Sequence, residues 1–448
     1  MDRYLFELPS SDLTNDETEF FCGEKSLRSP VRNQVEINIS CLDDLLPQDH
    51  RARDVWEYVN QLDNTFFLNK IKVVEGCGGP RSADPKILLA LWLYGMLEGI
   101  ASARHIARLC KEHHAFIWLC GGVSINYHTL SDYRSKNSEG FLKLLQESIA
   151  IMWKSGVFSP DEVAQDGTRV KANAGFSQYR TEQGLNRHME QAKEHMKNLE
   201  DELRKDPSVY TRREKSAKER ARNERMERIL KAQDELKAHK KNKIAISKKN
   251  NDKLTQEDVD KVRCSITDPE CRKMKMGDGG FRLAYNVQFS TSTDKNVIVG
   301  VDVVNTLDPG TLVPMMQQVQ ENLRKANCPT PSKWLVDSAY ANNDDLDKAQ
   351  QHFPNITVYS TPTSNHKNVD PLEPRKNDKP AMRELRERMK SEKAKKIYNK
   401  RGAAAEHSNA MTKNMGMREF LVNGLSKIKH MALLYAIAHN MMSYFRTT

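Results

Sequence analysis

The first third of the chain has the hydrophobic spacing of α-helices. Over residues 49–157, apolar positions recur every three or four residues, which predicts a run of amphipathic or buried helices. The clearest helix begins at Pro85, where Ser82 or Asp84 can cap the N-terminus. Short helices at close spacing are typical either of a plain bundle or of a helix-turn-helix arrangement. The preceding segment, residues 1–48, carries few helix signals and has room for one short strand and a turn near its end.

Between residues 181 and 250 the pattern changes to long polar helices with sparse apolar positions. These positions are spaced by three, four and seven residues on either side of Pro207, which is typical of two helices packed along a narrow stripe. They are Met189, Met196, Leu199 and Leu203 before the proline, and Met226, Ile229 and Leu236 after it. The segment holds 20 Lys and Arg against 13 Asp and Glu. We predict a helical hairpin inserted over residues 180–262, whose positive charge is either a solvated face or a nucleic-acid-binding arm.

Strand-like patterns occupy much of the remaining chain. A short apolar run ends at Asp166, and two alternating runs after Phe281 flank a turn at residues 291–295. A short buried strand then ends at Asp337, and another follows near residue 357, with helical segments between them and a helical stretch to near the C-terminus. Without the insertion, this order of strands and helices matches the ribonuclease-H-like fold, a mixed sheet with flanking helices.

The predicted fold class is therefore mixed, with both α+β and α/β character. It comprises a ribonuclease-H-like sheet with flanking helices, an all-helical N-terminal domain and a helical hairpin insertion. The predicted boundaries are an N-terminal segment at 1–48, the helical domain at 49–157, and a third domain at 158–448 that the insertion at 180–262 interrupts.

Composition and charge narrow the class of protein. Hydrophobic residues make up 38% of the 448 residues, charged residues make up 29%, and the formal net charge is +10. This basic excess favours a polyanionic partner such as nucleic acid. The longest strongly apolar stretch, residues 87–97, is too short to span a bilayer, and the N-terminus lacks the apolar core of a signal peptide. The eight cysteines are scattered without a C-x2-C pair, which indicates reduced cytosolic thiols and no zinc site.

Three carboxylates occupy positions suited to metal-dependent phosphodiester chemistry. Asp166 ends a strand-like run and is followed by small, flexible residues, Asp337 ends a buried strand, and Glu406 lies on a late helix. In a ribonuclease-H-like sheet the first and fourth strands are neighbours and a late helix packs across them, so we expect the three side chains to converge. Carboxylates suit two Mg²⁺ ions about 4 Å apart, which activate water and stabilise a leaving alkoxide. Four other acidic residues could compete for these roles: Asp302, Asp308, Asp344 and Asp345.

Five stretches of the sequence together resemble the DDE-type transposases of bacterial insertion sequences, from about Asp49 to Met442. They are "SADPKILLALWLYGMLEGIASARHIARLC", "DGTRVKANA", "TDPECRKMKMGDGGFRLAYNVQ", "LVDSAY" and "YNKRGAAAEHSNAMTK". The resemblance implies a DNA transposase that cuts at the ends of its mobile element and joins the freed 3′ hydroxyls to target DNA. It also implies that Asp166, Asp337 and Glu406 are the catalytic metal ligands, with two Mg²⁺ ions per site and Mn²⁺ as a substitute.

The last stretch resembles the glutamate signature of that family, with Tyr398 and Arg401 before Glu406 and Lys413 after it. Two departures stand out. Four residues separate Arg401 from Glu406, where the related signature often has three, and Ser408 and Asn409 follow where many relatives carry Pro and Phe. Seven residues advance a helix by about 700°, so Lys413 returns to within roughly 20° of Glu406, whereas Arg401 lies about 140° away.

The same region supplies the predicted phosphate contacts. We expect Tyr398, Arg401 and Lys413 to contact DNA, together with the basic stretch at residues 383–401 that includes Lys393, Lys395 and Lys396. Base-edge contacts are expected mainly from the helical domain, which makes residues 49–157 a DNA-binding domain.

The expected partner is double-stranded DNA, as element ends and as target. Pairing two ends suggests a homodimer. We expect the protein to act in the bacterial cytosol, in association with the nucleoid and without a membrane. Three alternatives remain open: a ribonuclease-H-like nuclease without joining activity, a non-catalytic DNA-binding protein derived from a transposase, and a coiled-coil scaffold built on residues 181–250.

Overall fold

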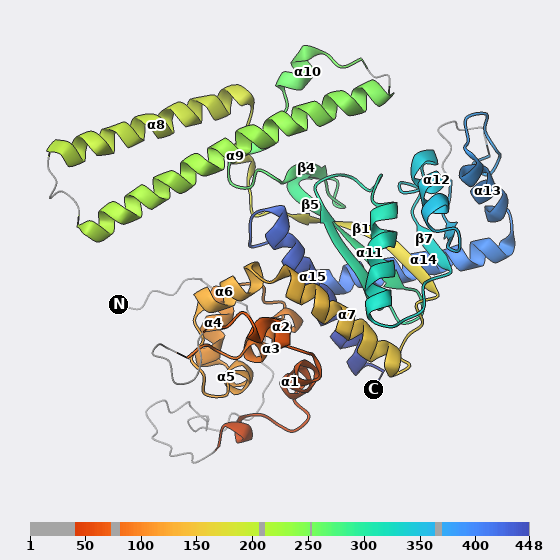
Figure 1. Cartoon of the computed structure of the whole chain (residues 1–448), viewed down its shortest axis with the longest axis horizontal. Coiled ribbons are helices and arrows are strands. Elements are labelled where there is room, and N and C mark those ends of the chain that lie inside the picture. Colours follow the sequence, from red (N-terminus) through yellow and green to blue (C-terminus); the bar gives the residue numbers. More distant parts are fainter. Residues whose placement is uncertain (1–40, 73–80, 206–210, 251–252, 363–369, 448) are drawn as a thin grey trace, which may run out of the picture. The chain divides into compact units, whose positions relative to one another are not determined.

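The structure is a computed structural model that describes residues 41–72, 81–205, 211–250, 253–362 and 370–447 (Figure 1). Its N-terminal part is helical. After a short 3₁₀ helix at Leu42–Leu45, the helices are α1 (Arg51–Gln61), α2 (Thr65–Leu68), α3 (Pro85–Leu97), α4 (Ala103–Glu112), α5 (His114–Cys120), α6 (Tyr127–Ser135) and α7 (Ser138–Lys154). The strand predicted near the end of residues 1–48 falls mostly outside the described residues, and the part that is described forms the 3₁₀ helix.

Helix α3 begins and packs as its sequence predicts. Asp84 caps it by accepting a hydrogen bond from the Lys86 N–H at 2.8 Å, and Pro85 takes the first helical position. Its side chains are buried on all sides because α1, α5 and the C-terminal helix α15 (Leu425–Phe445) pack around it, and α15 also packs against α6, α7 and the sheet strand β6. The last helix of the chain therefore completes the core of the helical region. None of the described helices is long and apolar enough to cross a membrane.

Six strands form one mixed sheet. They are β1 (Glu162–Lys171), β4 (Arg272–Lys275), β5 (Phe281–Ser292), β6 (Ile298–Val304), β7 (Lys333–Val336) and β8 (Thr357–Tyr359). The order is β4-β5-β1-β7-β8, and β6 shares with β4 the outer edge of β5. Strand β1 is antiparallel to β5 and parallel to β7, and β7 is parallel to β8. The mixed sheet and the helical N-terminal region of the prediction are thus both present.

Helices cover both faces of this sheet. On one face α14 (Glu392–Asn414) contacts β1, β5, β7 and β8, and α13 (Pro380–Met389) lies beside it. On the other face α11 (Leu312–Lys325) contacts β5 and β6, and α12 (Asn343–His352) follows β7. Successive residues of β1 point to opposite faces, so Asp166 faces α14, while Gln165 and Gly167 face the α11 side.

The insertion is a pair of long helices that lie side by side, α8 (Glu182–Lys205) and α9 (Arg212–Asn250) (Figure 1). The short strands β2 (Tyr179–Arg180) and β3 (Cys264–Ser265) pair at its base, and α10 (Gln256–Asp260) follows α9. Of the predicted apolar positions, Met189, Ile229 and Leu236 are buried, and Met196 and Met226 are half-buried. The same small core also contains Leu185, Ala192 and Ala232, together with Val262, Cys264 and Ile266 from the segment after α10. Pro207 and the side chains of Leu199 and Leu203 lie outside the described residues.

Two element boundaries differ from the sequence prediction. Strand β1 does not end at Asp166 but continues to Lys171, because residues 167–171 pair with β5. The predicted C-terminal helical stretch is interrupted at residues 415–424, where the Phe420 N–H donates to the Lys171 carbonyl and extends the sheet edge. The charged helix before it also ends, at Met389, and Ser391 caps a new helix.

Candidate active site

Neighbouring strands position the two predicted aspartates. In the parallel pairing of β1 with β7, Gln165 lies opposite Val336, so Asp166 and Asp337 follow at the next position of each strand. Adjacent strands are about 4.8 Å apart, which places the two backbones side by side. The Asp337 carboxylate accepts hydrogen bonds from the backbone N–H of Ser338 at 2.5 Å and from its hydroxyl at 3.2 Å.

Asp166 is half-buried, with 26% of its side chain exposed. Its Oδ2 accepts a hydrogen bond from Asn409 Nδ2 at 3.0 Å, and its Oδ1 lies 3.9 Å from Arg401 Nη1. Burial raises the pKa of the Asp166 carboxyl above its ordinary value, and Asp308 and Asp337 add to the increase. Arg401 and the Gly167 N–H oppose this increase without cancelling it.

Helix α14 presents Arg401 and Asn409 to Asp166. They are eight residues apart, hence about 80° apart around the helix, so both can reach one strand. Burial lowers the pKa of Arg401, but Tyr398, Asp166 and Asp337 together raise it above its ordinary value, so the guanidinium stays charged beside Asp166. Arg401 Nε and Asn409 Oδ1 are buried and have no hydrogen-bond partner among the described residues.

Glu406 is exposed on the same helix. It lies about 140° around the helix from Arg401 and about 60° from Asn409. Glu406 is therefore outside the arc of α14 between Arg401 and Asn409, the two residues that contact Asp166. Within the described ranges, no three His, Cys, Asp or Glu side chains form a group that could hold a metal ion. The structure therefore brings Asp166 and Asp337 together, and convergence of Glu406 with them stays a prediction.

Beneath Asp166, on the other face of the sheet, lies a buried polar network that the sequence analysis missed. The Tyr340 hydroxyl donates to Gln288 Oε1 at 2.7 Å, and Gln288 Nε2 donates to Asp308 Oδ1 at 2.9 Å. Gln165 Nε2 donates to Gln288 Oε1 at 3.3 Å and accepts a hydrogen bond from the Trp334 indole at its Oε1. These bonds connect β1, β5 and β7 directly under the two aspartates.

The four acidic residues considered as rivals have structural partners. Asp308 accepts three hydrogen bonds in the network, and Asp302 pairs with Lys429 at 2.5 Å. Asp344 pairs with Lys379 at 3.1 Å, and Asp345 accepts a hydrogen bond from the Gly310 N–H at 2.7 Å. Of the four, only Asp308 is close enough to Asp166 to be among the causes of its raised pKa.

The predicted DNA contacts spread along α14. The Tyr398 hydroxyl is 3.1 Å from the Thr361 hydroxyl, and Lys413 is half-buried. Lys393, Lys395 and Lys396 are exposed near the start of the helix, where Lys395 pairs with Glu392 at 2.8 Å. Asn409 was not among the predicted site residues, although the departure at Ser408 and Asn409 from the related signature marked the position.

Two family models match the chain, and both describe transposases. A model described as transposase domain (DUF772) matches residues 40–136, and one described as transposase DDE domain matches residues 364–445. The second match includes Arg401 and Glu406, whereas Asp166 and Asp337 lie outside both matches. No curated protein and no solved structure matches the chain. The matches cover the helical region and the C-terminal helices, agree with the resemblance seen in the motifs, and identify the chain as a DDE-type transposase of the insertion-sequence type.

Proposed function

We propose that Asp166, Asp337 and Glu406 form the catalytic centre of this transposase. The observation that carries the proposal is the placement of two aspartates at equivalent positions on adjacent parallel strands, beneath the helix that bears Glu406. Glu406 is three residues before Asn409, which contacts Asp166, so it is less than one helical turn from the aspartates along α14.

The residues present suit hard divalent cations. Their donor atoms are oxygens, and the buried Asn409 Oδ1 has no partner among the described residues. Asp166 and Asp337 would hold two Mg²⁺ ions, or Mn²⁺ in their place, with Glu406 completing the ligand set. When bound, such ions supply an activated oxygen nucleophile near neutral pH and stabilise the leaving oxygen.

The remaining residues of the site would hold the DNA. Arg401 has unused donors beside the aspartates and can bind the scissile phosphate, while Ser338 keeps the Asp337 carboxylate in place. The same arrangement would serve both steps of the reaction. In the first, water attacks the phosphodiester at the element end and a 3′ hydroxyl leaves; in the second, that hydroxyl attacks target DNA and displaces another 3′ oxygen.

We also infer a ribonuclease-H-like fold for residues 158–448, interrupted by the insertion at 180–262. The strand order β6-β5-β1-β7-β8, with β5 antiparallel to both β6 and β1 and the last three strands parallel, supports this assignment. Residues 49–157 would then be the DNA-binding domain that reads base edges.

The direct test of the proposed centre is a cleavage and joining assay on labelled DNA that carries the inverted repeats flanking the coding region. Wild-type protein should cut and join in Mg²⁺ and do neither in EDTA. Glu406→Gln should abolish both steps, whereas Glu392→Gln, an exposed glutamate at the start of the same helix, should leave them intact. Full activity of Glu406→Gln would remove that residue from the site.

The phosphate contacts can be tested by charge reversal at Lys393, Lys395 and Lys396. Affinity for element ends and for random DNA should fall alike, and the salt dependence of binding should lose a slope of about 0.9 for each phosphate contact removed. Lys325→Glu on α11, across the sheet from α14, is the matched control. Loss of binding to element ends alone would instead assign base recognition to α14.

Synapsis of two ends predicts a homodimer on DNA. Analytical ultracentrifugation of the full chain with and without a DNA end should show two chains for every pair of ends. A complex with one chain per pair of ends would contradict the dimer.

A further inference from the structure

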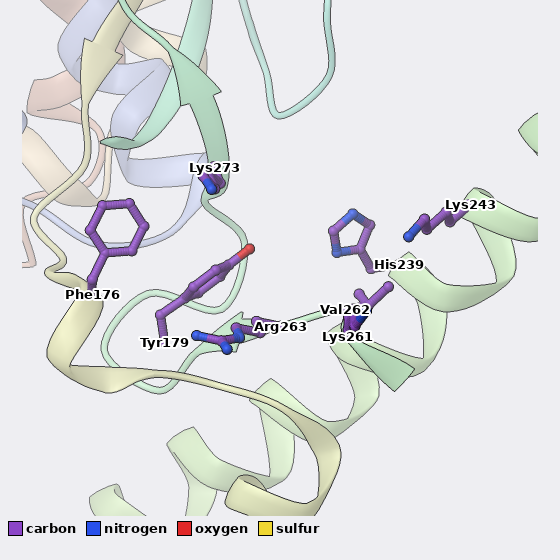
Figure 2. Close-up of a pocket in the computed structure, with 8 residues that line it drawn as sticks. All are labelled: Phe176, Tyr179, His239, Lys243, Lys261, Val262, Arg263 and Lys273. Carbon is purple, nitrogen blue, oxygen red and sulfur yellow. The ribbon is translucent and has the colours of Figure 1, made fainter. Parts of the chain in front are cut away.

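A cavity of about 470 Å³ lies at the base of the helical insertion (Figure 2). Phe176 and Tyr179, from the segment after β1, line one side of it, and His239 and Lys243 of α9 line the other. Lys273 of β4 also borders the cavity, as does the segment between α10 and β3. The volume is within the range of small-molecule sites, so one nucleotide-sized group fits.

The cavity is strongly basic. Four of its lining residues are cationic and none is acidic: Lys243, Lys261, Arg263 and Lys273. Lys261 pairs with Glu257 at 2.6 Å, and Lys243 donates to the Asp258 carbonyl. Arg263 and Lys273 are exposed, and neither pairs with a carboxylate in the part of the chain that the structure describes. Two unneutralised cations at the border of one cavity favour an anionic ligand such as a phosphate.

Aromatic rings give the cavity a second binding property. The Phe176 side chain is 47% exposed, and its ring meets that of Tyr179 at 5.8 Å in an edge-on arrangement. His239 Nδ1 is buried on the opposite side and has no hydrogen-bond partner among the described residues. An exposed ring beside cations that have no carboxylate partner among the described residues is the combination that binds single-stranded nucleic acid, because a base stacks on the ring while its phosphate pairs with the cations.

The position of the cavity relates it to the proposed catalytic centre through one strand. Strand β1 runs five residues from Asp166 to Lys171, about 17 Å at 3.3 Å per residue, and Phe176 follows five residues later. B-DNA rises about 3.4 Å per base pair, so the length of β1 beyond Asp166 corresponds to about five nucleotides. The cavity is thus separate from the two aspartates, and it lies beyond the end of the strand that carries Asp166.

We propose that this cavity binds one unpaired nucleotide of the DNA substrate, several nucleotides from the scissile phosphate. A duplex keeps its bases stacked and its width exceeds the cavity, so only an unpaired base can reach Phe176 and Tyr179. Arg263 and Lys273 bind the phosphate of that nucleotide. The inference rests on the proposed function, since it takes DNA bound at Asp166 as its reference point.

The test compares two probes on the full-length protein in EDTA, by fluorescence anisotropy. One probe is a blunt duplex, and the other is the same duplex with a short single-stranded thymidine extension. Wild-type protein should bind the extended probe more tightly. Phe176→Ala should weaken binding of the extended probe by on the order of tenfold and leave the blunt duplex unchanged. Arg263→Ala should act in the same direction.

Lys241→Ala is the matched control. Lys241 is on α9 between His239 and Lys243 but about 200° around the helix from each. Its substitution therefore removes one positive charge from the side of α9 that faces away from the cavity. Equal affinity of wild-type protein for both probes, or equal weakening of both by Phe176→Ala, would overturn the proposal. A preference for the extended probe without any metal-dependent cleavage would leave the cavity assignment standing and refute the catalytic centre instead.

Discussion

The two faces of strand β1 differ in how well their polar side chains are hydrogen-bonded. On the α14 face, the half-buried Asp166 has one side-chain hydrogen bond, from Asn409, and a loose ion pair with Arg401, and two nearby polar atoms have no partner among the described residues. On the α11 face, Gln165 and Gln288 use both their amide nitrogens and their carbonyl oxygens in a network that crosses three strands.

This difference assigns structural support to the α11 face and reactivity to the α14 face. A polar layer whose amides bond to one another is rigid because each member fixes its neighbours, although Asn286 Oδ1 and Ser290 Oγ on this face have no partner among the described residues. An under-bonded carboxylate, by contrast, costs stability until a ligand arrives. One strand therefore carries a reactive group on one side and its scaffold on the other. Substitutions on the α14 face should therefore reduce catalysis, and substitutions on the α11 face should reduce the stability of the fold.

The largest expected effect is on chemistry. Asp166→Asn and Asp337→Asn should each lower the cleavage rate at least about 10³-fold, because loss of a metal-ligand charge removes several kcal/mol of transition-state stabilisation. DNA binding should be largely kept, and neither variant should melt at a markedly lower temperature than the wild type. Gel assays of cleavage, alongside anisotropy with element-end DNA, check both parts. Unfolding of either variant, or full cleavage, would contradict a catalytic role.

A substitution on the opposite face should act on stability first. At Gly167 an added Cβ would lie 2.5 Å from Asp308 Oδ1 and 2.7 Å from Asn286 Oδ1, well inside contact distance. Gly167→Ala should therefore destabilise the protein by about 1–3 kcal/mol, as overpacking does. Urea denaturation measures the change. Gly175→Ala is the control, since its nearest neighbour would be at 3.7 Å; equal stability of the two variants would contradict the tight fit.

Removing one hydrogen bond of the buried polar network should lower stability by less than Gly167→Ala does. Tyr340→Phe removes a buried hydroxyl that donates to Gln288, which should cost about 1–2 kcal/mol while leaving Asp166 untouched. The melting temperature should fall and cleavage should persist. Tyr359→Phe, on β8, removes a hydroxyl without a hydrogen-bond partner among the described residues and should change little. A Tyr340→Phe variant that is stable but inactive would show that Tyr340 acts in catalysis and not only in supporting the sheet.

The α14 face was partly predictable from sequence, because strand patterns marked Asp166 and Asp337, and family motifs marked both of them and Glu406. Their partners were not predictable in the same way. Arg401 and Asn409 meet Asp166 only through the rotation of α14, which depends on packing such as the 3.2 Å contact of Ser408 with Thr291. A helical wheel relates residues within one helix but does not say which side faces the sheet.

The α11 face was not predicted at all. Gln165, Gln288 and Tyr340 look like ordinary strand and turn residues, and their bonds join positions 52 to 123 residues apart in sequence. The length of β1 was underestimated for a related reason. Residues 167–171 form a strand through pairing with β5, and local propensity at Gly167 and the basic residues after it does not show that pairing.

The smallest expected effect tests the cost of keeping Asp166 under-bonded. Because the folded protein raises the pKa of this carboxyl, the unfolded chain ionises first as the pH rises above about 3.9, and the native state loses stability relative to it. Asp166→Asn has no charge to bury, so in EDTA it should be more stable than wild type at neutral pH, and the gain should vanish below the pKa of the unfolded carboxyl. Asp161→Asn should do the opposite, because Lys333 and Ser332 lower the pKa of Asp161 and its charge stabilises the fold at neutral pH. Urea denaturation across this pH range measures both variants, and a destabilised Asp166→Asn at neutral pH would show that Arg401 and Asn409 satisfy the carboxylate after all.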